Sequence, residues 1–180
     1  MGDNPKPRDF FSRFFRRSPK QSRSRALVDA VVAALEEQLA NAGEGQDFTL
    51  DAVAERAGVG IGSLYEYFSG KESLLGVLIG RITERNFQSL LASLDSRPDS
   101  SLADTVGHMA EATAQTYLGS PKLTKVVITT VVRLGLMGVV VQERDRFAAE
   151  LALRAKRFFP NASGEGLQRS MQIIADSAMG

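Results

Sequence analysis

The feature that most constrains the fold is a pair of short apolar stripes at helical spacing, joined by a glycine-containing turn. In residues 50–57 the apolar side chains recur at i, i+3, i+4 and i+7, which places them on one face of an α-helix. Thr49 can cap that helix, and Gly58 follows where a helix ends in a left-handed residue. After a three-residue turn, residues 61–68 form a second short helical pattern. Two such helices around a tight turn are typical of a helix-turn-helix, with Leu50, Val53, Ala54, Ala57, Val59, Leu64 and Phe68 as the predicted inward positions.

Further apolar stripes predict that the rest of the chain is helical as well. One runs from Arg25 to the break at Asn41, and a long one of about 24 residues, or roughly 36 Å, follows the sequence Ser69-Gly70-Lys71-Glu72. That sequence has the spacing of a capping box, in which the first and last side chains each accept a hydrogen bond from a backbone N–H. Four more patterns cover 102–119, 121–132, 140–158 and 164–180. The predicted fold class is all-α, with eight helices.

One of these patterns is ambiguous. Residues 126–132 are rich in β-branched side chains and favour a strand on propensity alone. A strand needs a partner, and the sequence predicts no second strand elsewhere. We therefore expect a helix here too.

Positive charge is concentrated at the N-terminus. Residues 1–25 hold eight Lys and Arg against two Asp, a net charge of +6, so the other 155 residues carry −5 of the total of +1. Residues 1–24, with three prolines and the cluster Phe10, Phe11, Phe14 and Phe15, are predicted to be a disordered basic arm with a polyanionic partner. The predicted organisation is this arm over 1–24, a helix-turn-helix DNA-binding domain over 25–70, and a larger helical effector-binding and dimerisation domain over 71–180.

What the sequence lacks excludes several classes of protein. There is no Cys and a single His, His108, which removes thiol nucleophiles, zinc–thiolate sites and most histidine clusters. There is also no Gly-rich phosphate loop, so we expect no enzyme, no metal site and no cofactor. No run approaches the roughly 20 apolar residues of a membrane span, and the N-terminus has no apolar signal core. We expect a cytoplasmic protein without membrane contact.

The outward face of the second short helix suits a DNA groove, because its side chains are short or carry a hydroxyl group: Ile61, Gly62, Ser63, Tyr65, Glu66 and Tyr67. Ile61 and Ser63 are predicted to approach base edges. The predicted phosphate donors are Thr49, Tyr65, Tyr67 and Lys71, the last beside free N–H groups of a helix start. Residues 26–71 hold eight Asp and Glu against two basic residues, so positive charge must come from the arm, above all from Arg23 and Arg25.

The stretch from Thr49 to Leu75 resembles the DNA-binding signature of the TetR/AcrR family of transcriptional regulators. The similarity lies in Ala57-Gly58-Val59, in a glycine before Leu64-Tyr65, and in Tyr67-Phe68 followed by Lys71. At Gly60 the family often has Ser or Thr, so the second helix here lacks a side-chain cap.

This resemblance implies a repressor that binds double-stranded operator DNA as a homodimer. It implies base contacts from the start of the second helix, including Gly60, and backbone contacts from Thr49, Tyr65, Tyr67 and Lys71. It also implies release by a small apolar or amphipathic effector bound among the C-terminal helices. The expected pocket residues are Phe87, His108, Met109, Tyr117, Arg133 and Met137.

Two alternatives stay open. Met and aromatic side chains at helical spacing are also the ordinary content of a helical core, so each pocket residue has a core interpretation. The Phe/Arg arm fits, as an alternative, the amphipathic anchor of a helical membrane-surface or scaffold protein. The tyrosines and Lys71 at phosphate-binding positions favour DNA, because a scaffold does not need them.

Overall fold

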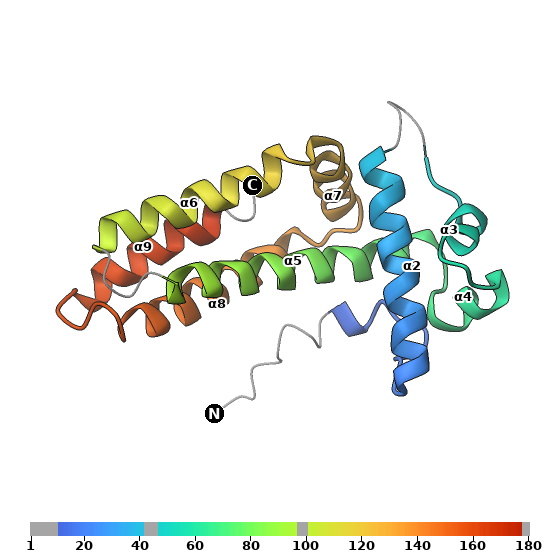
Figure 1. Ribbon diagram of the computed structural model, residues 1–180, viewed down its shortest axis with the longest axis horizontal. Coiled ribbons are helices and arrows are strands. Elements are labelled where there is room, and N and C mark those ends of the chain that lie inside the picture. Colours follow the sequence, from blue (N-terminus) through green and yellow to red (C-terminus); the bar gives the residue numbers. More distant parts are fainter. Residues whose placement is uncertain (1–10, 42–46, 97–100, 178–180) are drawn as a thin grey trace. The chain divides into compact units, whose positions relative to one another are not determined.

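The computed structural model describes residues 11–41, 47–96 and 101–177, and every regular element in these residues is an α-helix (Figure 1). The predicted all-α fold with eight helices is confirmed in this part of the chain. The helices are α2 (Ser22–Asn41), α3 (Leu50–Arg56), α4 (Ile61–Tyr67), α5 (Lys71–Asp95), α6 (Leu102–Leu118), α7 (Pro121–Arg133), α8 (Met137–Ala155) and α9 (Gly164–Ser177).

The predicted start and stop of α3 are confirmed. The Thr49 hydroxyl oxygen accepts a hydrogen bond from the Ala52 N–H at 3.2 Å, and Gly58 has a φ of 66°. The predicted capping box before α5 is wrong in its pairing. The helix begins at Lys71, so Ser73 occupies its third position, and the Ser73 hydroxyl accepts from the Ser69 N–H at 3.3 Å.

The ambiguous β-branched stretch is helical. It lies in α7, as predicted. Val126 and Val127 are half-buried against apolar side chains of other helices, whereas Ile128 and Val132 are exposed. Tertiary packing of one helical face outweighs the strand propensity of the sequence.

The chain divides into two compact units. The first comprises Met1–Ile82 and Lys122–Thr130, and the second comprises Thr83–Pro121 and Val131–Gly180. The division at Ile82 lies inside α5, so the residue-70 boundary that we expected falls within the first unit. The first turns of α5 therefore belong to the same unit as α3 and α4.

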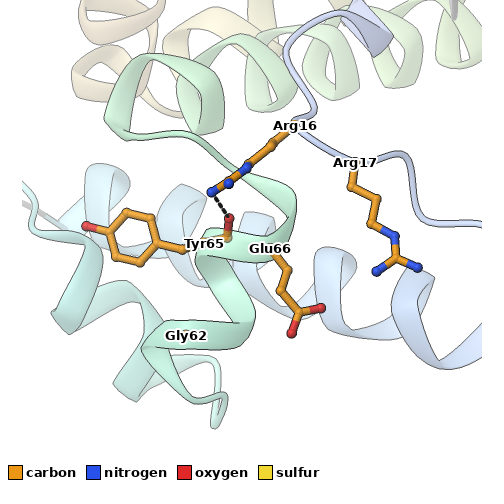
Figure 2. Close-up of a pocket in the computed structure, with 5 residues that line it drawn as sticks. All are labelled: Arg16, Arg17, Gly62, Tyr65 and Glu66. Carbon is orange, nitrogen blue, oxygen red and sulfur yellow. Dashed lines mark hydrogen bonds between the residues drawn. The ribbon is translucent and has the colours of Figure 1, made fainter.

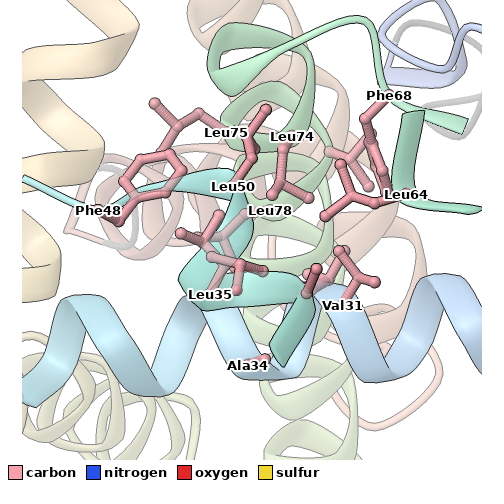
Figure 3. Close-up of a cluster of buried hydrophobic side chains, with 14 of the residues drawn as sticks. Val31, Ala34, Leu35, Phe48, Leu50, Leu64, Phe68, Leu74, Leu75 and Leu78 are labelled. Atoms are coloured by element: carbon pink, nitrogen blue, oxygen red, sulfur yellow. The ribbon is translucent and has the colours of Figure 1, made fainter. Parts of the chain in front are cut away.

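The first unit has a continuous apolar core formed by α2, α3, α4 and the start of α5 (Figure 3). Leu35, Leu64, Phe68, Leu74 and Leu78 are fully buried in it. Burial of a side chain of this size stabilises the fold by about 1.5–3 kcal/mol. This core therefore fixes the position of the short helix α4, which is too short to be stable alone.

The second unit is built around an aromatic pair. Phe87 of α5 and Phe147 of α8 stack with their ring centroids 4.0 Å apart and their planes within 9° of parallel. Met109 of α6 and Met171 of α9 are fully buried in the same core. All four helices thus contribute to one apolar cluster.

An ion pair ties the end of α5 to α8 within the second unit. The Arg154 guanidinium donates two hydrogen bonds to the Asp95 carboxylate, of which Nε to Oδ1 spans 2.8 Å. These hydrogen bonds lower the pKa of Asp95. A carboxyl group with a depressed pKa in the folded state stabilises the protein above its unfolded-state pKa, and that stabilisation is lost as the pH falls through its folded-state pKa.

We therefore predict that Asp95→Asn lowers the Tm at pH 7, and that the difference from the wild type shrinks as the pH falls below about 4. Thermal unfolding followed by circular dichroism between pH 3 and 7 measures both. Asp29→Asn, which removes an exposed carboxylate 2.5 Å from Arg81, is the control and should change Tm little. Equal Tm values for Asp95→Asn and the wild type at pH 7 would contradict the prediction.

Candidate nucleic-acid interface

The turn between α3 and α4 is fixed by two backbone hydrogen bonds around Gly58. The Gly58 N–H donates to the Glu55 carbonyl and the Val59 N–H to the Ala54 carbonyl, each at 3.0 Å. This is the hydrogen-bond pattern of a Schellman motif, which needs a left-handed residue at the position of Gly58. The motif ends α3 and lets α4 begin at Ile61.

The outward face of α4 is set by the side chains that its inner face buries. Leu64 is fully buried, whereas Gly62, Tyr65 and Glu66 are exposed, and Tyr65 keeps 43% of its surface. Ile61 and Ser63 are half-buried at the edge of this face. A Cβ atom built at Gly62 meets no atom within 4 Å. The start of α4 thus leaves its backbone open to close approach by a large partner.

Gly60 occupies the N-cap position of α4 and forms no side-chain cap. The departure noted at this position in the sequence therefore has the expected structural result. A Cβ atom at Gly60 also meets nothing within 4 Å. No side chain at this position therefore accepts a hydrogen bond from the first N–H groups of α4, and the Ser63 N–H donates instead to the Gly60 carbonyl at 2.9 Å.

The outward position that we expected for Tyr67 is wrong. Tyr67 keeps only 8% of its surface and belongs to the core of the first unit. Its place is explained by helical geometry, because Leu64 lies three residues earlier on the same buried face. Its main chain has a different role, since its carbonyl accepts the Arg16 N–H at 2.8 Å.

Lys71 and Thr49 lie at the starts of helices, as predicted. Lys71 is the first residue of α5, and its Nζ lies 2.6 Å from Asp47 Oδ2 and 5.0 Å from the centre of the Phe48 ring. Thr49 is exposed, although its hydroxyl oxygen already caps α3. A phosphate that binds Lys71 has to replace an exposed carboxylate partner.

Residues 11–24, the described part of the predicted arm, differ from the disordered segment that we expected. Phe11–Phe14 form a single helical turn, and the Phe15 ring lies 5.6 Å from the buried Phe68 ring. The Ser73 hydroxyl donates to the Phe14 carbonyl. Apolar burial by the phenylalanines offsets the entropy lost on ordering the segment. Phe10 and the residues before it lie outside the described residues.

The same packing bears on the membrane-anchor alternative. Phe11, Phe14 and Phe15 are half-buried against the first unit, so they do not form an apolar face turned toward a lipid surface. An amphipathic anchor needs such a face. The described part of the arm therefore does not support that alternative.

The two arginines that we expected to supply charge lie in the first turn of α2. Arg23 and Arg25 are both exposed, and the Arg25 Nη2 donates to the Lys20 carbonyl at 2.8 Å. The surface also forms a hollow beside α4, and neither Arg23 nor Arg25 lines it.

That hollow, of about 500 Å³, is lined by Arg16, Arg17, Gly62, Tyr65 and Glu66 (Figure 2). The Arg16 Nη1 donates to the Tyr65 carbonyl at 3.3 Å. Two arginines from the N-terminal segment (residues 11–25) thus lie beside the exposed face of α4. The sequence did not single out Arg16 or Arg17, because the contact that brings them here spans 49 residues.

The residues expected to form an effector pocket do not share one environment. Phe87 and Met109 lie in the core of the second unit, in agreement with the alternative that they are ordinary core residues. His108 and Arg133 are exposed, and Met137 keeps 50% of its surface. The side chain of Tyr117 lies outside the described part of the structure.

None of the described helices is by itself long and apolar enough to cross a membrane. One pair, Pro121–Arg133 with Met137–Ala155, reaches the required length and composition together, but it is bent by 115°. In the same described residues, no group of three or more His, Asp or Glu side chains is placed to hold a metal ion.

A short helix held outward by a three-helix core, after a Schellman turn and beside two arginines, defines a DNA-binding domain of the helix-turn-helix class. Residues 40–78, which contain this motif, match the family described as bacterial regulatory proteins, tetR family. The resemblance seen in the sequence is confirmed for this segment, which is similar to the DNA-binding region of the TetR family of transcriptional regulators. No curated protein and no solved structure matches the chain significantly.

The two glycines of the motif predict opposite effects on stability. Gly58→Ala should destabilise the protein by about 1–2 kcal/mol, because alanine is strained at a φ of 66°. Gly62→Ala should stabilise it, by up to about 1 kcal/mol, because alanine has the higher helix propensity and its Cβ meets no atom. Denaturant unfolding measures both changes.

Gly62→Ala should nevertheless weaken binding to duplex DNA, because the added methyl group stands on the face that we expect to approach the groove. Gly107→Ala is the matched control. Gly107 lies in α6 with open space around it, so that variant should gain stability without losing DNA affinity. Unchanged DNA affinity of a folded Gly62→Ala variant would show that this end of α4 does not approach DNA.

Proposed function

We propose that this protein is a sequence-specific repressor that acts in the cytoplasm and binds a near-palindromic operator as a homodimer. The observation that carries the proposal is the exposed start of α4, where small residues leave the backbone open on a helix fixed by a buried core. The N-terminal residues of a recognition helix are those that contact base edges in the major groove.

The residues at this end of α4 divide into two roles. Ile61 and Ser63 flank Gly62 at the groove-facing end, so their side chains discriminate bases. Tyr65 supplies a hydroxyl donor to the DNA backbone from the exposed side of the same helix. Thr49 and Lys71 supply further donors at the starts of α3 and α5.

The distribution of charge supports a role for the N-terminal segment in DNA binding, together with the helix-turn-helix. Residues 13–25 contain six Arg and Lys and no acidic residue, whereas residues 26–71 have a net charge of −6. Phosphate binding driven by counterion release needs positive charge at the interface. We assign that charge to the basic segment, including Arg23 and Arg25, rather than to the helix-turn-helix itself.

The experiment first selects a binding site from random duplex DNA with the purified protein, and then compares variants on the selected duplex. Lys71→Ala and Tyr65→Phe should weaken binding to the selected and to random duplexes by a similar factor, because phosphate contacts carry no sequence information. Ser63→Ala or Ile61→Val should change the preferred base at one position, at a cost of about 1–3 kcal/mol. Fluorescence anisotropy titrations measure each affinity.

The selected sites should contain two inverted half-sites whose centres lie about 34 Å apart, or a multiple of that distance, as a two-fold dimer requires. Lys71→Ala should change unfolding stability by no more than about 0.5 kcal/mol, so a loss of binding is not a loss of folding. If folded Lys71→Ala and Tyr65→Phe variants keep full affinity, α4 and its neighbours are not the DNA-binding surface.

Release by an effector is the second part of the proposal. It is supported by the similarity of residues 40–78 to the tetR family and by the largely apolar composition of the second unit's core. We propose a small apolar or amphipathic effector that binds in this unit and lowers operator affinity. Native mass spectrometry of the purified protein, before and after addition of the selected duplex, tests for such a molecule. A bound molecule that is lost when DNA binds supports effector control, whereas retention of the molecule in the DNA complex contradicts it.

A further inference from the structure

We propose that Arg17 binds a DNA backbone phosphate in the hollow between the N-terminal segment and α4, with Arg16 as the residue that positions it. The proposal rests on the proposed function, because it extends the DNA interface of α4 to a second, adjacent contact. It assigns DNA binding to a segment that lies outside the matched residues 40–78.

Two glycines of α5 allow the N-terminal segment to pack closely against this helix. A Cβ atom built at Gly76 would lie less than 3 Å from the Phe14 ring, and one built at Gly80 would lie 2.5 Å from the Phe11 ring. Gly76 and Gly80 are one helical turn apart, as are the two phenylalanines, whose ring centroids are 6.4 Å apart. The absence of side chains at these two positions is what lets both rings lie against α5.

Hydrogen bonds then tie the segment to the end of α4. The Arg16 N–H donates to the Tyr67 carbonyl, and the Arg16 guanidinium donates to the Tyr65 carbonyl. Carbonyl groups at a helix C-terminus need such donors, because they have no partner within the helix. Arg16 is thereby committed to the protein, and it holds the next residue beside α4.

Arg17 is the member of the pair whose charge is available. It is exposed, and its guanidinium forms neither a hydrogen bond nor an ion pair with the residues that the structure describes. Figure 2 shows its side chain on the N-terminal segment next to Glu66 of α4. A guanidinium group matches the geometry of a phosphate and remains charged at all working pH values.

The position on α4 indicates a phosphate rather than a base. The start of α4 is the end with the exposed glycines, and it is this end that faces base edges in the proposed function. The hollow extends from Gly62 at this end to Tyr65 and Glu66, which lie toward the other end of the helix. At that other end a recognition helix leaves the groove near the sugar–phosphate backbone. The carboxylate of Glu66 repels a phosphate at this position, so the charge of Glu66 lowers the affinity for DNA.

The test compares Arg17→Gln, Glu66→Gln and the control Arg169→Gln on random duplex DNA between 50 and 300 mM KCl. Arg169 is an exposed arginine of α9, so the control makes the same charge change in the second unit. Arg17→Gln should lower affinity about three- to tenfold and reduce the slope of log K against log salt by about 0.9, the value for one phosphate. Glu66→Gln should raise affinity, and Arg169→Gln should leave it unchanged.

A second variant tests whether DNA binding needs the packing of the N-terminal segment on α5. Gly76→Ala should displace Phe14 and cost as much affinity as Arg17→Gln, whereas Gly107→Ala should cost none. The double variant Gly76→Ala/Arg17→Gln should bind no more weakly than either single variant, because both remove the same contact.

The outcomes separate this inference from the proposed function. If Lys71→Ala loses binding while Arg17→Gln and Glu66→Gln match the wild type, the function stands and the phosphate site is overturned. If the wild-type protein binds no duplex at all, the proposed function fails and takes this inference with it.

Discussion

The burial of Leu64 and Phe68 is the constraint on which the rest of the interface depends. Both side chains are fully buried between α2 and the first turns of α5, and they fix which face of α4 is turned outward. A seven-residue helix cannot hold that orientation by itself, because isolated helices of this length are unstable in water. The exposed positions of Gly62 and Tyr65 follow directly from this burial.

The charge distribution explains why the N-terminal segment is attached to the helix-turn-helix. The motif itself is acidic, with a net charge of −6 over residues 26–71, so it repels DNA at long range. Arg16, Arg17 and the neighbouring basic residues supply the opposite sign beside α4. The attraction between basic segment and acidic motif is weakened by water and salt, so apolar packing of Phe11 and Phe14 on α5 holds the two together.

Local patterns in the sequence predict those features whose cause is local. The Thr49 cap, the left-handed Gly58 and the length of α5, which has 25 residues where the sequence predicts about 24, depend on neighbours within one or two helical turns. The outward position predicted for Tyr67 is wrong for a local reason, because Tyr67 follows Leu64 by three residues and shares its buried face. The packing of the N-terminal segment on α5 has no local signal, since nothing near Phe11 in the sequence points to Gly80. The partner of the Ser69 N–H was missed for a smaller reason, as α5 begins only at Lys71 and brings Ser73 into reach.

Amide hydrogen–deuterium exchange of the full chain, with and without a duplex selected by the protein, tests the central claim most directly. The exchange rate of each peptide reports how often its backbone N–H groups open to water, and this rate falls where DNA covers the backbone or suppresses local opening. The account predicts slower exchange in two separate segments, residues 58–72 and residues 11–17, with α9 unchanged. Tight DNA binding without any change in residues 58–72 would contradict it.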